Sequence, residues 1–322
     1  MESRLAVVTT IKHVTEQTPR WIEHHLKLVQ KLFVFIDHPS ENFEFQNILA
    51  QKYGTERLQF FHKNEKLIQS WESFPIYESI RNLVDRFVTL RQALNIEYLL
   101  RVVKVSNFDW IFHLDDDEML YFSKKDCTLS EYLSKVPDRY DQLVLQNYEA
   151  IPTELDADNF FATQRIFKKS PPMVSFYQLE LLKEKLERPY YFTSYNHGKC
   201  AFSPKKLIDR GLYYPDGVHR FHVDEEKSLD CNFLDLAVLH YPFPSFGMYY
   251  GKFSGLNRKR VYEYEALGSS DQNFYSESRK LFFQANPLEI EHFYSSNVVY
   301  SRDELALLKD LKLILEIEGE ND

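Results

Sequence analysis

A strand-like apolar segment that runs directly into four acidic residues constrains this chain more than any other feature. Trp110-Ile111-Phe112-His113-Leu114 has the aromatic and β-branched composition of a buried strand, and Asp115-Asp116-Asp117-Glu118 follow it without a break. Ionised carboxylates are costly to bury without a partner, and neighbouring carboxylates repel one another. The four acids therefore require solvent, protonation or a cation where the strand ends.

The position of these acids favours a cation. Open α/β sheets bind their ligands at the carboxyl ends of the strands, and carboxylates there can hold a divalent cation that has a phosphate as a further ligand. Asp115 and Asp117 are two residues apart, so an extended or turning backbone directs both side chains to the same side. Asp116 would then point away and Glu118 inward. The alternative is a solvated acidic turn, because most runs of charge are solvated.

The segments around the acids predict an α/β fold. A helical pattern opens at Pro19, and apolar spacings of three and four predict one or two helices between residues 75 and 105. Thr-Leu-Ser-Glu at 128–131 and Ser-Arg-Asp-Glu at 301–304 are capping boxes that predict helices after them. Strands are expected at residues 4–11, 32–36, 58–62, 110–114, 142–148, 189–194, 200–202 and 236–241. Strand, helix, strand, connection and strand at these short spacings indicate a parallel α/β arrangement.

Composition bounds the class of protein. Only 9 of the 322 residues are glycine and no Ser/Gly/Pro-rich run occurs, which favours one compact domain over residues 1–260 with a helical extension over 261–322 packed on it. The net charge is −9 and no basic block exceeds Arg258-Lys259-Arg260, so no nucleic-acid partner is expected. Three distantly spaced cysteines suit a reducing, cytoplasmic setting. No apolar stretch of about 18 residues and no signal-peptide pattern occurs, so no transmembrane segment is expected.

Other polar residues also lie at predicted strand ends. Asp37 could accept hydrogen bonds from a nucleoside, although an Asp ahead of Pro39 is equally typical of a turn. His240 ends an apolar run, where a histidine is more often structural than a metal ligand. Lys252 lies among aromatic residues and could neutralise a diphosphate, although a single lysine on a helix is usually solvated. No H-E-x-x-H, G-x-S-x-G, P-loop or G-x-G-x-x-G motif occurs, which leaves carboxylate, cation and phosphate chemistry as the one coherent proposal.

An ordered set of segments over roughly residues 5–255 resembles GT-A-fold glycosyltransferases of the family 2-like and family 92-like groups. Asp115 and Asp117 match the D-x-D pair that binds manganese and the diphosphate of a sugar nucleotide in that group. Two departures are His13-Val14, where the group has Asn-Glu after the lysine, and Gly247-Met248, where it has an acidic pair. The other matching segments are Val8–Leu26, Phe35–Ser40, Gln92-Ala93 with Asn95, His197-Gly198-Lys199, His219, Leu239-His240-Tyr241, and Ser245 with Lys252.

The resemblance implies an α/β fold of GT-A type, a Rossmann-like mixed sheet flanked by helices. It also implies a glycosyltransferase that needs Mn²⁺ or Mg²⁺. It would move a sugar from a nucleotide-diphosphate sugar, UDP- or GDP-linked, to a hydroxyl acceptor such as a glycan, with inversion at the anomeric carbon. The metal ligands would be Asp115, Asp117 and His240. Contacts to the donor would come from Thr10, Lys12, Asp37, Gln92, Asp115, Asp116, His219 and Lys252. Asp216, Asp224 and Glu225 are the candidates for the catalytic base, and the sequence does not choose among them.

Two other functions fit the same residues. A non-catalytic protein that binds nucleotide sugars or glycans could keep the fold and lack the base. A metal-dependent phosphodiesterase or nuclease could use the acidic cluster, but the acidic net charge makes this class the least favoured. Oligomeric state, donor sugar and acceptor stay open at this stage.

Overall fold

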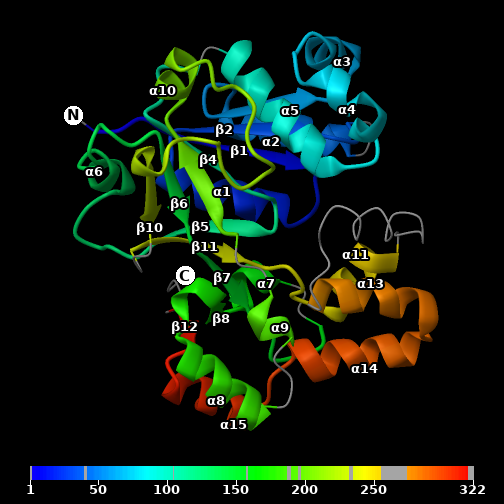
Figure 1. Ribbon diagram of the computed structural model, residues 1–322. Helices are drawn as coiled ribbons and strands as arrows, with labels where there is room; N and C mark the ends of the chain where they lie inside the picture. Colours follow the sequence, from blue (N-terminus) through cyan, green and yellow to red (C-terminus); the bar gives the residue numbers. More distant parts are fainter. Residues whose placement is uncertain are drawn as a thin grey trace. The chain divides into compact units, whose positions relative to one another are not determined.

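The computed structural model describes residues 2–39, 42–103, 105–156, 159–186, 190–194, 197–231, 235–254 and 274–317 (Figure 1). Contacts within the chain divide it into two compact units that alternate along the sequence. The first unit comprises residues 1–146 and 197–238, and the second comprises residues 147–196 and 239–322. The predicted boundary at residue 260 lies outside the described residues, so that division stays a prediction.

The first unit is built on a seven-stranded mixed sheet of order β10-β6-β9-β4-β1-β2-β3. Strands β3, β2, β1 and β4 are parallel neighbours, while β9 runs antiparallel to both β4 and β6. The predicted α/β class with a mixed sheet is therefore confirmed. The strands are β1 (Leu5–Ile11), β2 (Lys31–Ile36), β3 (Leu58–His62), β4 (Trp110–His113), β6 (Gln142–Leu145), β9 (Lys199–Phe202) and β10 (Ser228–Cys231).

Helices cover this sheet through apolar faces. Leu94 and Leu99 of one helix, α5, are fully buried in a cluster with Ala6 and Val8 of β1 and Phe35 of β2. The first unit contains α1 (Thr18–Leu28), α2 (Phe43–Tyr53), α3 (Glu65–Glu72), α4 (Tyr77–Val84), α5 (Val88–Arg101), α6 (Leu129–Leu133), α10 (Pro204–Asp209) and the 3₁₀ turn η2 (Glu225–Lys227). The sequence analysis had no prediction for α2, because its apolar Phe43 and Ile48 are exposed and leave little amphipathic pattern.

Helix α1 holds the strand that follows the acids, β5 (Glu118–Phe122). The indole N–H of Trp21 donates to the carbonyl oxygen of Glu118 at 2.7 Å, and Nε2 of His25 accepts from the backbone N–H of Leu120 at 3.1 Å. Nε2 of His24 lies 2.7 Å from the Leu120 carbonyl oxygen. Burial lowers the pKa of His25 well below its usual range, so the ring is neutral and can accept. These side chains are therefore structural, and they anchor one end of the acidic turn.

The second unit combines an antiparallel sheet of order β12-β8-β7 with an aromatic helical core. Strand β11 (Leu236–His240) begins in the first unit and ends in the second. Tyr191, Phe243, Tyr249 and Phe274 are fully buried together. The other elements are β7 (Asn147–Ala150), β8 (Ile166–Lys169), β12 (Ile314–Glu316), η1 (Pro171–Met173), α7 (Phe160–Thr163), α8 (Phe176–Leu186), α9 (Tyr190–Thr193), α11 (Phe246–Ser254), α13 (Phe274–Gln284), α14 (Pro287–Val298) and α15 (Arg302–Asp310).

Two predictions about the strands need correction. The expected strand at 189–194 is wrong, because Tyr190–Thr193 forms the helical turn α9. Its aromatic residues suggested a strand, but Tyr191 and Phe192 are aromatic because they fill the core of the second unit. The expected single strand at 142–148 is two strands, β6 and β7, separated at Gln146. Both predicted capping boxes are present, at Thr128 with Glu131 and at Ser301 with Glu304.

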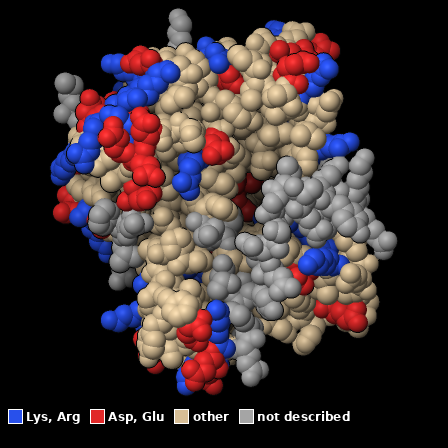
Figure 2. Space-filling view, in the orientation of Figure 1, with Lys and Arg blue, Asp and Glu red and all other residues tan. Residues whose placement is uncertain are grey.

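The surface mixes the two signs of charge. On the face shown in Figure 2, the described Lys and Arg side chains are interspersed with Asp and Glu and form no basic stripe. Among the described residues, no helix combines the length and the apolar composition that a membrane crossing requires.

Candidate functional site

Helix α5 sends polar side chains to the carboxyl ends of neighbouring parallel strands. The amide Nδ2 of Asn95 donates to the hydroxyl of Thr10, near the end of β1, at 2.9 Å. The amide Nε2 of Gln92 donates to Oδ1 of Asp115, just beyond β4, at 2.5 Å. Because Gln92 and Asn95 are three residues apart, they lie on the same face of the helix. One helix therefore sets the positions of side chains at two strand ends.

The same helix also holds Asp37, which directly follows β2. The guanidinium of Arg91 donates to both carboxylate oxygens of Asp37, at 2.8 and 2.6 Å, and to the carbonyl oxygen of Val84 at 2.6 Å. Both side chains are buried, and the ammonium of Lys63 lies 3.9 Å from Asp37. A bidentate pair of this kind fixes the carboxylate in one orientation. The carboxylate of Asp37 is therefore fixed in one orientation, and its remaining lone pairs can accept hydrogen bonds only from that orientation.

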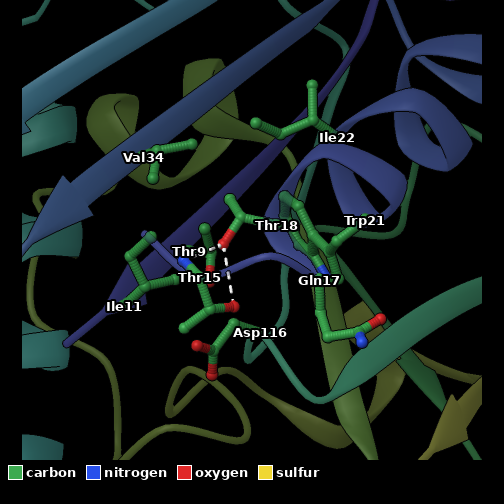
Figure 3. A pocket seen from close by; sticks show the side chains of 9 residues that line it. All are labelled: Thr9, Ile11, Thr15, Gln17, Thr18, Trp21, Ile22, Val34 and Asp116. Carbon is green, nitrogen blue, oxygen red and sulfur yellow. Dashed lines mark hydrogen bonds between the residues drawn. The ribbon is translucent and has the colours of Figure 1, made fainter. Parts of the chain in front are cut away.

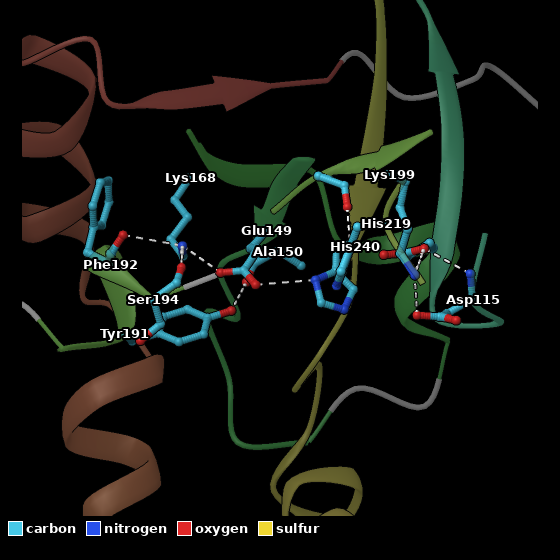
Figure 4. Close-up of polar contacts among 12 residues, drawn as sticks. Asp115, Glu149, Ala150, Lys168, Tyr191, Phe192, Ser194, Lys199, His219 and His240 are labelled. Carbon is cyan, nitrogen blue, oxygen red and sulfur yellow. Dashed lines mark hydrogen bonds and ion pairs between the residues drawn. The ribbon is translucent and has the colours of Figure 1, made fainter. Parts of the chain in front are cut away.

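Asp115 is held by a buried ammonium as well as by the Gln92 amide. The Nζ atom of Lys199 lies 2.5 Å from Oδ2 of Asp115 (Figure 4). The same atom lies 3.3 Å from Oε2 of Glu118. Glu118 in turn accepts the backbone N–H of Asp115 at 2.8 Å, which closes the acidic turn. Lys199 and Glu118 are fully buried, whereas the Asp115 side chain is 27% exposed. One face of the Asp115 carboxylate is thus anchored and another reaches solvent.

The charges in this turn shift one another's pKa values. Burial opposes ionisation of Asp115, but the Lys199 ammonium outweighs it, and the pKa of Asp115 falls below its usual value. Burial likewise disfavours the charged form of Lys199, but Asp115 and Glu118 more than offset it and raise the pKa of Lys199. Both groups are therefore charged at neutral pH.

A glycine allows Lys199 to reach this position. Gly198 has a φ of +62°, and a Cβ atom there would collide with the carbonyl oxygen of Leu145 in β6. Only glycine combines a left-handed backbone with so close an approach to a neighbouring strand. The Nδ1 atom of His219 lies 2.8 Å from the Gly198 carbonyl oxygen and secures the same turn. The backbone of the His-Gly-Lys segment therefore places the Lys199 ammonium beside Asp115 and Glu118.

Two histidines near this ammonium are neutral. Burial, followed by the Lys199 ammonium, lowers the pKa of His113 in β4 to about 3. The same two causes lower the pKa of His219 to about 4. The rings of His219 and His197 lie 5.2 Å apart. Neither His113 nor His219 adds positive charge at neutral pH, and the predicted donor contact of His219 stays a prediction.

The remaining acids of the turn lie toward solvent. Asp116 is exposed and lines a small pocket with the hydroxyl-bearing Thr9, Thr15 and Thr18 (Figure 3). The Thr9 hydroxyl is buried and makes no hydrogen bond with any described residue. Asp117 is partly exposed and close enough to Asp115 that repulsion between the two carboxylates offsets part of the lowering of the Asp115 pKa. Within the described part of the chain, no three His, Cys, Asp or Glu side chains gather as a ready metal cage.

Several predicted residues lie away from this turn along the chain. Lys12 is exposed just after β1. In the second unit, the Lys252 ammonium lies 5.1 Å from the centre of the Phe243 ring, and Nδ1 of His240 lies 3.2 Å from Glu149. The three candidate bases of the first unit are all exposed: Asp216, Asp224 and Glu225. The assignments of these six residues stay predictions.

The sequence analysis did not predict the ion pairs of two buried cations among the described residues of the first unit, Arg91 and Lys199. Arg91 had no motif around it, and nothing local indicates that it pairs with Asp37, which is 54 residues away. Lys199 was noted only as part of the His-Gly-Lys segment. The local signal that could have indicated it is the glycine directly before it at the start of an apolar strand, since such a glycine marks a close backbone approach.

No family model matches this chain. It is similar to two curated Arabidopsis thaliana proteins. Both are glycosyltransferase-like. Glycosyltransferase-like At2g41451 is 25% identical over 271 residues, which is 81% of this chain and 56% of that protein. Glycosyltransferase-like At3g57200 is 22% identical over 253 residues, 76% of this chain and 48% of that protein. The chain thus spans about half the length of these curated relatives.

Solved structures give weaker likenesses. Core-mannan synthase A from Aspergillus fumigatus, in its Mn/GDP form, has a TM-score of 0.35 and 12% identity, covering 75% of each chain. The mannosyltransferase Ktr4p from S. cerevisiae has a TM-score of 0.34 and 11% identity, covering 74% of this chain and 70% of that one. TM-scores this far below 0.5 establish neither a shared fold nor a shared function.

Proposed function

We propose that this chain is a glycosyltransferase of GT-A type, which moves a sugar from a nucleotide-diphosphate sugar to a hydroxyl acceptor. One observation carries the proposal: α5 fixes Thr10, Asp37 and Asp115 at the carboxyl ends of β1, β2 and beyond β4. Nucleotides bind at this edge of parallel α/β sheets. The glycosyltransferase-like relatives support the same reaction class.

The acidic turn fits a divalent cation. Lys199 faces two of its four carboxylates, Asp115 at 2.5 Å and Glu118 at 3.3 Å, while Asp116 is exposed and Asp117 partly exposed. Gln92 and Lys199 each use one lone pair on the oxygens of Asp115, and a carboxylate oxygen has two. Asp115 and Asp117 would hold Mn²⁺ or Mg²⁺, and the cation would stabilise the charge that develops on the leaving diphosphate.

The chain's own residues would bind and orient the donor. Asp37, held in one direction by Arg91, would accept a hydrogen bond from the nucleoside, and the Thr10 hydroxyl lies at the neighbouring strand end. Lys12, Asp116, His219 and Lys252 are the further candidates for donor contacts, and His240 is the candidate for a third metal ligand. For an inverting reaction one of the exposed carboxylates Asp216, Asp224 and Glu225 would take the acceptor proton.

Calorimetry and nucleotide release test this proposal with one pair of variants. Wild type should bind UDP or GDP more tightly with Mn²⁺ than with EDTA and should slowly release the nucleoside diphosphate from the matching sugar nucleotide. Asp117→Asn should abolish the Mn²⁺-dependent part of donor binding. It should leave the melting temperature of the metal-free protein unchanged or raised, because carboxylate repulsion is relieved.

The matched control is Asp138→Asn, which removes an exposed carboxylate that pairs with Lys206 at 2.8 Å. This variant should bind the donor as wild type does. Donor binding by Asp117→Asn at wild-type affinity in Mn²⁺ would remove the metal assignment. Tight donor binding without any release of nucleotide would instead indicate a non-catalytic nucleotide-sugar-binding protein.

A further inference from the structure

The three candidate bases lie on one segment, which connects β9 to β10 within the first unit. After β9 and α10 this segment forms a turn at residues 216–220, and it rejoins the sheet at β10. Asp216 starts the turn, whereas Asp224 and Glu225 lie just before β10. The acidic turn belongs to the same unit, so strand pairing fixes where each candidate lies relative to it.

The turn at residues 216–220 is closed by its own backbone. The N–H of Asp216 donates to the carbonyl oxygen of Arg220 at 2.8 Å, and Gly217 between them has a φ of +66°. Val218 at the tip is buried, whereas Asp216 is exposed. The tip of the turn therefore packs against the protein and the carboxylate of Asp216 reaches solvent.

This turn is attached beside the acidic turn by two contacts. The backbone of Val218 is hydrogen-bonded to the ring of His113, two positions before the first of the four acids. The Nδ1 atom of His219 lies 2.8 Å from the carbonyl oxygen of Gly198, directly before the buried lysine that pairs with those acids. Asp216 is two residues from Val218, so their Cα atoms are at most about 7 Å apart. Asp216 therefore lies at the same edge of the sheet as the acids.

Asp224 and Glu225 lie at the opposite edge. Strand β9 begins beside the acids and ends at Phe202, which pairs with Gln142, the first residue of β6. The first residue of β10 pairs with Gln142 in a parallel register, so β10 also starts at this far edge. The length of the four-residue strand β9, about 10 Å, separates the two edges. The two carboxylates just before β10 are therefore on the far side of the sheet from the acidic turn.

We propose that Asp216 is the catalytic base that takes the proton from the acceptor hydroxyl. The inference rests on the proposed glycosyltransferase function and selects one of its three candidates. A base must come within hydrogen-bond reach of the reacting hydroxyl, so it has to lie at the edge where the donor binds. The acceptor oxygen forms a bond to the anomeric carbon while the bond from that carbon to the diphosphate breaks. The hydroxyl proton passes to Asp216, and the nucleoside diphosphate leaves with the electron pair.

Hydrolysis of the UDP- or GDP-sugar that wild type turns over, with water as the acceptor, tests this choice. Asp216→Asn should lower the rate at saturating donor by about 100-fold or more. Its affinity for the nucleoside diphosphate in Mn²⁺ should not change, because the N–H that closes the turn is kept and the variant loses only the proton acceptor. The matched control is Glu226→Gln, which removes an exposed carboxylate next to Glu225 and should hydrolyse the donor as wild type does.

Azide distinguishes a lost base from a disturbed structure. Azide is an anionic nucleophile without a proton to give up, so its attack on the anomeric carbon needs no base. In Asp216→Ala, which opens space for the anion, sodium azide should restore release of the nucleoside diphosphate and should yield a glycosyl azide of inverted configuration. Mass spectrometry detects this product, and NMR gives its anomeric configuration.

Wild-type turnover by Asp216→Asn would overturn the inference, and so would a larger loss in Asp224→Asn or Glu225→Gln. Inactivity of Asp216→Ala that azide does not restore would also overturn it, because that result indicates a structural role. These failures are distinct from a failure of the proposed function. If wild type neither bound nor hydrolysed any UDP- or GDP-sugar, the glycosyltransferase proposal would fall and this inference with it. If wild type hydrolysed the donor and Asp216→Asn did so equally, only the choice of base would be wrong.

Discussion

Replacing Lys199 by methionine tests the electrostatics of the acidic turn most directly. Methionine keeps the length and apolar body of the side chain but removes the ammonium that lies 2.5 Å from Asp115 and 3.3 Å from Glu118. Glu118 is fully buried, so the variant leaves a buried carboxylate without its counter-charge. Removing one partner of a buried ion pair costs about 3–5 kcal/mol of unfolding free energy. We expect a loss in that range at pH 7.

The pH dependence of this loss has a definite sign. Lys199 lowers the pKa of Asp115 in the folded protein, so this pair stabilises the fold above the unfolded pKa of Asp115 and loses that contribution as pH falls through the folded pKa. In Lys199→Met the uncompensated carboxylates favour protonation instead, and the variant gains stability relative to wild type in acid. The difference between the two proteins should therefore be largest near pH 7 and should shrink toward pH 4.

Urea denaturation at pH 7 and at about pH 4.5 measures both effects. Lys52→Met is the control, because Lys52 pairs with Glu23 at 2.7 Å on the surface, and its loss should change the unfolding free energy little. The double variant Lys199→Met/Asp115→Asn should recover part of the loss, since one unpaired charge is then gone. A Lys199→Met protein that is as stable as Lys52→Met, or whose deficit is the same at both pH values, would refute the reasoning.

Two further substitutions address the neighbouring supports of the site. Arg91→Met should lower the unfolding free energy by about 3 kcal/mol and should weaken nucleotide binding. This is the lower end of the range for a broken buried ion pair, because the Lys63 ammonium lies 3.9 Å from Asp37 and partly replaces the lost charge. Urea denaturation measures the stability and calorimetry the binding, with the exposed Arg81→Met as the control. Wild-type stability in Arg91→Met would show that the pair is dispensable. Gly198→Ala should lower the unfolding free energy by about 3 kcal/mol or more in the same denaturation experiment, because alanine is strained at a φ of +62° and its Cβ collides with a carbonyl oxygen. Gly211→Ala is the control: Gly211 also has a positive φ, but the space around it is open, so this variant should lose less stability.

The acidic run shows which features of the candidate site can be predicted from the local sequence. An apolar strand that ends in carboxylates could be recognised from residues 110–118 alone, and the structure places β4 and the exposed Asp116 as that pattern predicts. The pattern also predicted that Glu118 points inward, but it could not show which residue its carboxylate pairs with. Glu118 is fully buried because its carboxylate closes the turn onto the Asp115 N–H and faces Lys199, and Lys199 is 81 positions further along the chain.

Sequence periodicity and end signals indicated many of the helices and strands, because strand composition, capping boxes and a first-turn proline act over a few residues. They gave no prediction for α2, α3, α8, α10, β5, β8, β10 or β12. The tertiary structure alone decided how the chain alternates between two units, why Tyr190–Thr193 is helical, and which charges are paired. Arg91 with Asp37 and Lys168 with Glu149 are brought together by packing of separate elements. The partner of a buried charge is the opposite charge that tertiary packing brings next to it, so the pairing cannot be predicted from neighbouring residues in the sequence.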